Sequence, residues 1–230
     1  KTYFPGHWIS LLIFITIVSL LLGQPDLGQT VVIAAVWLSQ FFLAGLPMLL
    51  VMSFFVCAIG GLAAAYFFFD HVRSRIDRFV DPTTGDTYQI DRSLEAFSNG
   101  GFFGTGPGEG EIKDHLPDAH SDFIFAVAGE EFGVFIALAV IGLFAFLVLR
   151  GYFRIVSEPS LFVFLAVAGL LTQFGFQALI HISSSLQLIP AKGMTLPFIS
   201  YGGSSFLALS IGMGMVLALT RKRPGREDLI

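Results

Sequence analysis

The most restrictive feature of this sequence is a series of long apolar segments that are almost free of charged residues. Six such segments cover residues 7–23, 29–45, 48–69, 122–149, 160–183 and 201–220. A helix that crosses the hydrocarbon part of a bilayer needs about 20 apolar residues, with a range of about 17–25. The sequence therefore predicts an all-α integral membrane protein, a polytopic helical bundle with a long extracytoplasmic loop between the third and fourth helices.

Composition agrees with this fold class. Of the 230 residues, 54% are hydrophobic and 13% are charged, and the mean hydropathy is +0.77. Soluble domains carry about 25% charged residues. The charges are also unevenly placed, because residues 70–122 contain eleven acids and five bases. We therefore expect one acidic loop attached to a slightly basic membrane body.

The polar segment divides the chain into parts with different expected surroundings. Residues 1–69 are predicted to form three transmembrane helices, and residues 70–121 an extracytoplasmic acidic loop with a helical pattern in its middle, at 88–97. Residues 122–220 are predicted to form three more transmembrane helices, with a re-entrant-like segment at 186–205 that Pro and Gly interrupt. Residues 221–230 are expected to form a cytoplasmic tail.

Basic residues in short loops predict the orientation. With six helices, both ends of the chain lie on one side of the membrane, and that side carries most of the bases outside the acidic loop: Lys1, Arg150, Arg154, Arg221, Lys222, Arg223 and Arg226. The short loops on the other side carry only Lys192. Both ends are therefore predicted to be cytoplasmic, and the acidic loop, Asp26 and residues 190–205 to share the outer face.

Asp122 lies where the polar loop meets the fourth apolar segment. Either Ser121 or Asp122 is expected to be the N-cap of that helix, where the helix dipole stabilises a negative charge. A carboxylate at a membrane boundary is equally a candidate catalyst. The two roles are compatible, because a cap lowers the pKa and keeps a carboxylate ionised as a base.

Just before Asp122, an acidic and histidine-rich cluster comprises Asp114, His115, Asp118 and His120. Each of these residues alone fits a solvated loop. Together they offer ligands for a divalent cation such as Mg²⁺, although their spacing is not diagnostic. A metal site and a cofactor requirement both stay open on the sequence.

The interrupted segment 186–205 holds the second set of candidates. Lys192 lies between a proline and a glycine, and a lone surface lysine of this kind usually has no special role. Non-helical backbone at membrane depth is tolerated only where protein or a water-filled cavity surrounds it. The helix start that follows offers free backbone N–H groups to an anion. With Asp26, the candidate binding residues here are Ser200, Tyr201, Gly202, Gly203, Ser204 and Ser205.

Polar residues also occur inside the apolar segments. Glu130 and Glu131 lie about 100° apart around a helix, so we expect that they cannot both face one site and that at least one is structural. Gln173, Gln177 and His181 recur every four residues. We expect the two glutamines to form interhelical hydrogen bonds and His181 to be near the outer face, where it could line a cavity.

Several of these motifs together resemble those of the FtsW/RodA/SpoVE (SEDS) family. They are PAKG at 190–193, LPFISYGGSS at 196–205, QPDLG at 24–28, LPDAHSDFIFA at 116–126 and GEEFG at 129–133. The match runs over essentially the whole chain, and the combination is very specific. The forms at 88–97 and 104–110 look more like the division branch of the family, FtsW, than like RodA.

The resemblance implies a fold and an activity. Family members have ten membrane helices, of which the six here correspond to the last six. The family polymerises the peptidoglycan precursor lipid II and releases undecaprenyl pyrophosphate, in the bacterial inner membrane and, for this branch, at the division septum. It works with a class B penicillin-binding protein (a transpeptidase) and other division proteins, with no nucleic-acid partner. The family's catalytic Asp falls on Asp122 and its motif Lys on Lys192.

The chain departs from the family's common residues at Ser121, Ala191 and His181, where Thr, Thr and Asn are usual, and no charged group is lost. Two other functions remain open on the sequence. A lipid II flippase would use a similar lipid cavity but would need alternating access and no general base. A non-catalytic scaffold for division proteins would need neither.

Overall fold

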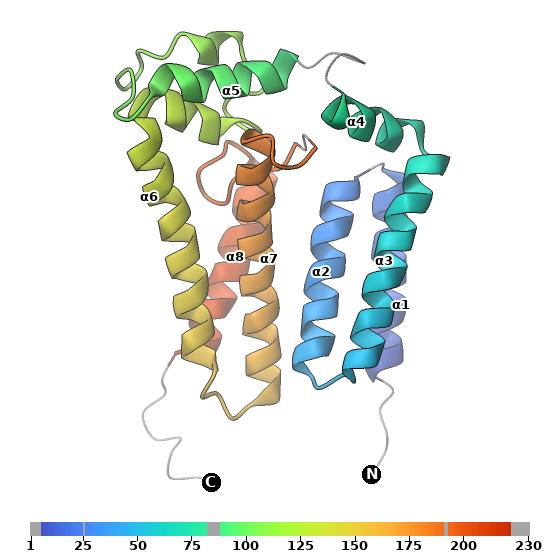
Figure 1. The fold of residues 1–230 in the computed structure, drawn as a ribbon. Helices are drawn as coiled ribbons and strands as arrows, with labels where there is room; N and C mark the ends of the chain where they lie inside the picture. Colours follow the sequence, from blue (N-terminus) through green and yellow to red (C-terminus); the bar gives the residue numbers. More distant parts are fainter. Residues whose placement is uncertain (1–5, 25, 82–87, 191–192, 222–230) are drawn as a thin grey trace, which may run out of the picture.

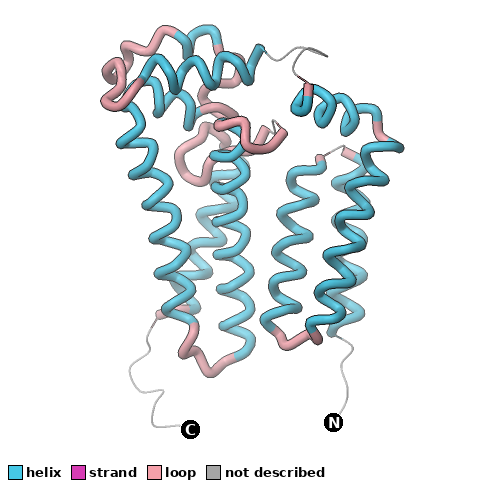
Figure 2. Tube along the Cα trace, viewed as in Figure 1, coloured by secondary structure: helices cyan, strands magenta, loops and turns pink. Residues whose placement is uncertain are grey.

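The computed structural model describes residues 6–24, 26–81, 88–190 and 193–221, and this part of the chain contains helices and loops but no strands (Figures 1 and 2). Apolar helices lie side by side, and a polar layer of shorter helices and loops covers one end of them (Figure 1). The predicted all-α polytopic membrane fold is confirmed.

Among the described residues, the bundle consists of six long apolar helices: α1 (Gly6–Gly23), α2 (Leu27–Leu43), α3 (Met48–Phe68), α6 (Ile124–Ile155), α7 (Leu161–Ser185) and α8 (Gly203–Leu219). By length and composition, α1, α3, α6 and α7 are able to cross a membrane. The other two, α2 and α8, have 17 residues each, which is close to the lower limit of about 17 for a span.

The polar layer contains α4 (Asp70–Val80), α5 (Tyr88–Gly100) and the short 3₁₀ helix η2 (Ile112–His115). The helix expected at 88–97 is confirmed as α5, whereas α4 was missed because its many charges were taken for a loop. An Arg73–Asp77 ion pair one turn apart stabilises α4 internally, and a hydrogen bond of 2.8 Å from the Tyr66 hydroxyl to Asp77 links α4 to the end of α3.

Local capping explains where two of the helices begin. The Asp26 carboxylate accepts a hydrogen bond of 3.1 Å from the Gln29 amide at the start of α2, and Ser160 caps α7 in the same way. The start of α6 differs from the prediction. Phe123 occupies its N-cap position and no side-chain cap hydrogen bond forms there, so the expected capping by Ser121 or Asp122 is wrong.

Two groups of helices, α1–α3 and α6–α8, meet where α2 packs against α7 (Figure 1). The Gln40 amide donates to the Leu165 carbonyl oxygen over 3.4 Å across this contact. A Cβ atom on Gly169 would lie only 2.2 Å from Gln40 Nε2, so the glycine is what allows the close approach.

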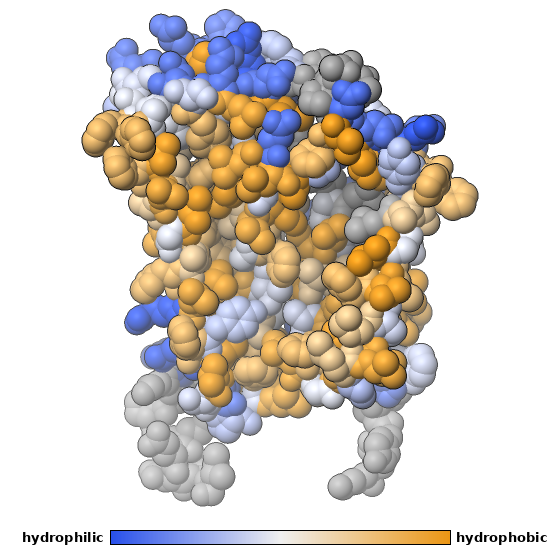
Figure 3. All heavy atoms as spheres, viewed as in Figure 1, coloured by the Kyte–Doolittle hydropathy of each residue, from blue (hydrophilic) through white to orange (hydrophobic). Residues whose placement is uncertain are grey.

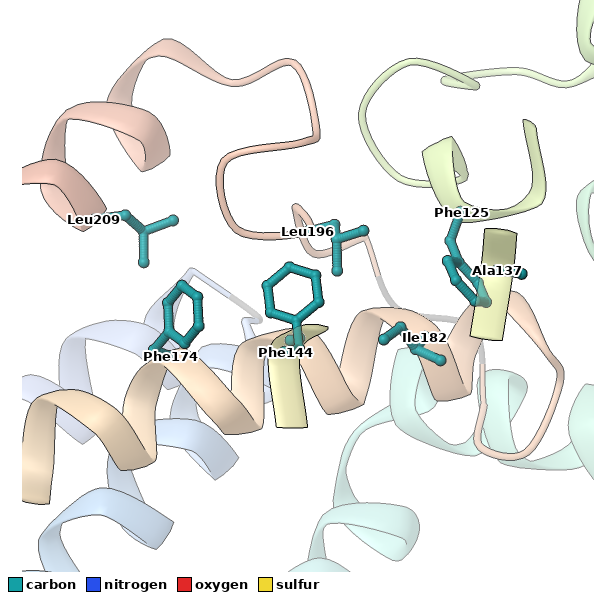
Figure 4. Packing of buried hydrophobic residues seen from close by; sticks show 8 residues of the cluster. Phe125, Ala137, Phe144, Phe174, Ile182, Leu196 and Leu209 are labelled. Atoms are coloured by element: carbon teal, nitrogen blue, oxygen red, sulfur yellow. The ribbon is translucent and has the colours of Figure 1, made fainter. Parts of the chain in front are cut away.

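The second group has its own apolar core. Phe125, Phe144, Phe174, Leu196 and Leu209 come from α6, α7, α8 and the loop before α8, and they pack against each other (Figure 4). Leu196 is 1% exposed, so the interrupted segment reaches into this core. The outer surface is an apolar band beneath the polar layer (Figure 3), as expected for helices that face lipid.

Helix α6 is broken near its start. Gly133 has φ 77° and ψ −179°, a conformation that is essentially restricted to glycine. An unbroken helix would join the Val134 and Phe135 amides to the Glu130 and Glu131 carbonyl oxygens.

The loop after α5 takes the place of those two bonds. The Val134 and Phe135 amides donate to the carbonyl oxygens of Gly101 and Phe102 over 3.0 and 3.4 Å. The carbonyl oxygens of Glu130 and Glu131 accept from the amides of residues 105 and 106 over 2.9 and 3.0 Å. We call residues 100–106 the inserted loop, because its backbone lies between the two halves of the broken turn.

We predict that Gly133→Ala lowers the thermal unfolding temperature of the complete protein in detergent. The backbone angle at Gly133 costs a residue with a Cβ about 1–3 kcal/mol, and that Cβ would lie 2.4 Å from the Phe102 carbonyl oxygen. Gly142→Ala in the same helix is the matched control, because no atom lies within 4 Å of its added Cβ and alanine favours a helix. Equal unfolding temperatures for the two variants would contradict this role of Gly133.

Candidate functional site

Hydrogen bonds join two polar stretches that the sequence predicted to be functional: residues 114–122, which end at Asp122, and the interrupted segment 186–205. The Tyr201 amide donates to the His120 carbonyl oxygen over 2.9 Å. The Ser200 hydroxyl donates to the Ser121 carbonyl oxygen over 2.6 Å and accepts from the Leu196 amide over 2.7 Å. The turn before α6 and the loop before α8 therefore form one unit.

Asp122 lies at the centre of this unit. Its amide donates to the Asp118 carbonyl oxygen over 2.9 Å, which closes a turn in which Asp118 has φ 55°. Its carboxylate lies against the backbone of the second stretch, because a Cβ on Gly193 would be 2.6 Å from Asp122 Oδ2. The absence of a side chain at Gly193 thus leaves the carboxylate room to sit between the two stretches.

The electrostatic setting of Asp122 differs from that of a helix cap. Partial burial raises the pKa of the Asp122 carboxyl above its usual value, and the nearby Asp118 charge raises this pKa further. A hydrogen bond from Ser121 acts in the opposite direction, with a smaller effect on the pKa. The expectation that Asp122 has a lowered pKa is therefore wrong, and the carboxylate is a stronger base than a solvated aspartate.

Helix α7 holds the loop before α8 in place. The Gln177 amide group donates to the Thr195 carbonyl oxygen over 3.0 Å and to the Ser205 hydroxyl of α8 over 3.3 Å. Thr195 and Ser205 also hydrogen-bond to each other over 2.7 Å. His181 is fully buried and pairs through Nδ1 with the Met194 carbonyl oxygen, so it supports the loop from behind.

The start of α8 is more open. Gly202 is the N-cap residue in an extended conformation, and Gly203 and Ser204 are exposed. The Tyr201 side chain is 81% exposed beside them. A ligand from outside could reach this helix start, whereas Ser200 and Ser205 already use their hydroxyls to hold the loop.

Glu130 serves the polar layer as a buried acceptor. Its carboxylate accepts hydrogen bonds from the backbone amides of residues 111, 112 and 113 over 2.9–3.1 Å, and from the Asn99 side chain over 2.9 Å. The neighbouring Glu131 forms an ion pair with Lys113. Both carboxylates therefore face the same short segment, residues 111–113, so the expectation that they cannot both face one site is wrong. The expectation that at least one of them is structural agrees with the contacts of Glu130.

The remaining candidates are less closely tied to Asp122. Asp26 caps α2, at the end of the bundle that the polar layer covers (Figure 1). Asp114, Asp118 and His120 have exposed side chains, and Gln173, unlike Gln177, is exposed on α7. Within the described ranges, no three His, Cys, Asp or Glu side chains are grouped as metal ligands. Lys192 lies outside the described residues, so its role stays a prediction from the sequence.

The contacts of two supporting residues were not identified from the sequence. The fit of Gly193 against Asp122 leaves no trace in spacing, since the two are 71 positions apart in the chain. The partners of Glu130 are mostly backbone amides, which every non-proline residue possesses and no motif reveals. The GEEFG motif at 129–133 does mark the place of these carboxylates in the sequence, because its two glycines flank Glu130 and Glu131.

Comparison with known proteins adds a family match. A model of the FtsW/RodA/SpoVE family, described as cell cycle protein, matches residues 2–224. A "Probable peptidoglycan glycosyltransferase FtsW" of Caulobacter vibrioides is 50% identical over 221 residues, which are 96% of this chain and 57% of the relative. A protein of the same name from Saccharophagus degradans is 40% identical, over 90% of this chain and 55% of its own length.

Solved structures give the same picture for the fold. The crystal structure of the rod shape determining protein RodA of Thermus thermophilus matches with a TM-score of 0.61 and 25% sequence identity, and covers 97% of this chain and 59% of the RodA chain. The chain thus spans a little more than half the length of the relatives and structures that it matches.

We predict that Ser200→Ala destabilises the site. The substitution leaves the Leu196 amide and the Ser121 carbonyl oxygen without this partner, and each partly buried group left unpaired costs about 1–3 kcal/mol. Thermal unfolding of the complete protein in detergent should show a lower midpoint for Ser200→Ala than for the control Ser204→Ala, whose side chain is exposed. A midpoint unchanged in both variants would argue against the role of Ser200 as a link.

Proposed function

The chain belongs to the FtsW/RodA/SpoVE family of cell cycle proteins, and from this premise we propose that the protein to which it belongs is a peptidoglycan glycosyltransferase of the division type. Its substrate would be lipid II, which it would polymerise into glycan strands. Support comes from the names of the relatives and from one observation in the fold: a half-buried carboxylate, Asp122, fixed between the two polar stretches at the edge of the membrane helices.

The proposed reaction needs few groups from the protein. A sugar 4-hydroxyl oxygen attacks the anomeric carbon of a second lipid II, a new β-glycosidic C–O bond forms, and the C–O bond to the pyrophosphate breaks with inversion. The hydroxyl proton goes to Asp122, and the bonding electron pair leaves with undecaprenyl pyrophosphate. A base near the attacking hydroxyl and positive charge near the leaving group are the two requirements.

The surroundings of Asp122 suit the role of base. Partial burial and the Asp118 charge raise its pKa, which makes the ionised form a better proton acceptor. For the leaving group, the exposed helix start at Gly203 and Ser204 offers backbone N–H groups, and Lys192 is the candidate cation from the sequence. A divalent cation is a further candidate at the pyrophosphate. Asp114, Asp118 and His120 are the donors that the sequence offers for it, but in the described part of the chain they do not form a group of three ligands.

The partners and location of the protein follow from the same proposal. A class B penicillin-binding protein would cross-link the strands, other division proteins would recruit both enzymes, and the site of action would be the septum of a bacterial inner membrane. The orientation predicted from the basic residues would put the Asp122 site on the outer face, where lipid II sugars lie.

We predict that Asp122→Asn almost abolishes glycan synthesis by the complete protein together with its transpeptidase. The substitution keeps the size of the side chain but removes the basic oxygen, and a general base contributes typically about 10²–10⁴-fold. Gel-resolved glycan synthesis from purified lipid II is the assay. Glu109→Gln, at an exposed position of the polar layer that has no assigned role in the reaction, is the control and should retain most of the activity.

A rate for Asp122→Asn above about a tenth of the normal value would be too high for the loss of a general base, and the base would then be sought at Asp118 or Asp114. A second measurement, lipid II transport by the same proteins reconstituted in proteoliposomes, distinguishes this proposal from a flippase. The flippase would be favoured if neither the parent protein nor any variant polymerised lipid II, while both the parent and Asp122→Asn still transported it.

We also predict a pH dependence. As the pH falls through the raised pKa of Asp122, the carboxylate is protonated and stops acting as a base, so kcat/KM should decline at a pH above the usual range for an aspartate. Asp118→Asn removes the charge that raises this pKa and preserves a backbone at φ 55° that Asn tolerates. The acidic limb of the profile should therefore move to lower pH in Asp118→Asn but not in the control Glu109→Gln. An unmoved limb in Asp118→Asn would refute the coupling.

A further inference from the structure

We propose that the inserted loop, residues 100–106, enters the lipid bilayer at the end of the bundle that the polar layer covers, with Phe102 and Phe103 as its lipid contacts. In the sequence this glycine-rich loop belongs to the acidic segment and is expected in water. Its side chains, its backbone hydrogen bonds and its position along α6 point instead to the edge of the membrane.

The position along α6 comes from the charges that flank its apolar part. Residues 132–149 carry no charge, and Glu131 and Arg150 stand at their two ends. Eighteen residues at about 1.5 Å each give about 27 Å, close to the hydrocarbon thickness of about 30 Å. Val134 and Phe135, which bond to the inserted loop, therefore lie within the first turn inside the hydrocarbon region.

The backbone of the inserted loop is suited to such a place. Non-helical backbone survives at membrane depth only if its polar groups have partners within the protein. The Gly104 amide donates to the Gly100 carbonyl oxygen over 2.7 Å, and four further bonds tie the loop to α6 on both sides of Gly133. Glycines also let the two backbones touch, since a Cβ on Gly104 would lie 2.2 Å from the Glu131 carbonyl oxygen.

The side chains at the tip of the loop are apolar and uncovered. Phe102 is 69% exposed and Phe103 is 84% exposed. Both rings lie beside Phe135, with centroid distances of 6.1 and 5.4 Å. Phe135 itself is 56% exposed on the membrane-spanning face of α6. The two phenylalanines thus extend an apolar surface that already faces lipid, and the space-filling view shows this band reaching up to the polar layer (Figure 3).

Lipid is the occupant that these observations favour over a protein partner. The apolar surface of the loop is continuous with that of the spanning helix, whose exposed Phe132 and Ile136 flank the same turn. Phenylalanine is among the side chains whose insertion into the hydrocarbon region is favourable. Because α5 leads directly into the inserted loop, this contact would also fix the depth of the polar layer above the membrane.

Spin-label accessibility in phospholipid bilayers tests the proposal. Phe103→Cys, in a Cys57→Ala background of the complete protein, is labelled with a nitroxide and reconstituted without any partner protein. Two matched reference sites are Leu143→Cys, exposed in the middle of α6, and Glu109→Cys, exposed in the polar layer. Collisions with oxygen report lipid, and collisions with a water-soluble nickel chelate report water.

We expect the Phe103 label to collide more with oxygen than with nickel, as Leu143 does, and Glu109 to show the reverse. Nickel accessibility at Phe103 equal to that at Glu109 would place the loop in water and overturn the proposal. Low accessibility to both reagents would mean that protein covers the loop, for example a second copy of the chain, and would overturn it too. Thermal unfolding of the labelled variants, compared with the Cys57→Ala parent, verifies that each is folded.

Discussion

The polar layer of this protein depends on two backbone hydrogen bonds that are missing inside α6, those from the Val134 and Phe135 amides to the carbonyl oxygens four residues earlier. By breaking at Gly133, the helix leaves two carbonyl oxygens and two amides without partners in α6, and unpaired backbone groups away from water are costly. The inserted loop supplies all four partners. Just before the break, Glu130 and Glu131 hold the segment 111–113 through three backbone amides and the Lys113 ion pair. The polar layer is thus attached through the backbone of a spanning helix.

From residue 113 the chain reaches Asp122 through consecutive tight turns, in which the amides of residues 116, 119 and 122 each bond to a carbonyl oxygen three or four residues earlier. Leu116, Ala119 and Phe123 are buried along this path and pack with Ala96 and Ala126. The segment is therefore fixed at one end by Glu130 and at the other by the loop before α8. Little freedom remains for the Asp122 backbone, which is the condition for placing a base with respect to a large lipid substrate.

The membrane fold was predictable because a span must be long and apolar whatever it packs against, and this requirement is written directly in the sequence. The capping of α6 was not predictable in the same way. Ser121 and Asp122 are suitable caps by type, yet the turn closed by Asp118 aims Asp122 at Gly193 instead. Likewise α4 was missed, because charges that elsewhere mark a loop here form an ion pair along a short helix. Asp122 could be recognised from the family motif, whereas its supporting contacts with Gly193 and Ser200 required the fold.

These contacts also change the physical reason for which Asp122 suits a base. A cap would stabilise the carboxylate and weaken it as a proton acceptor, since hydrogen bonds to the ionised form lower a pKa. Burial beside Gly193 and the repulsion from Asp118 do the opposite. The groups that build this environment lie on α5 to α8 and their loops, while α1 to α3 join them through the α2–α7 contact at Gln40 and Gly169. Through the described helix contacts, a change at Gln40 therefore acts on the site by shifting α7, whose Gln177 and His181 hold the loop before α8.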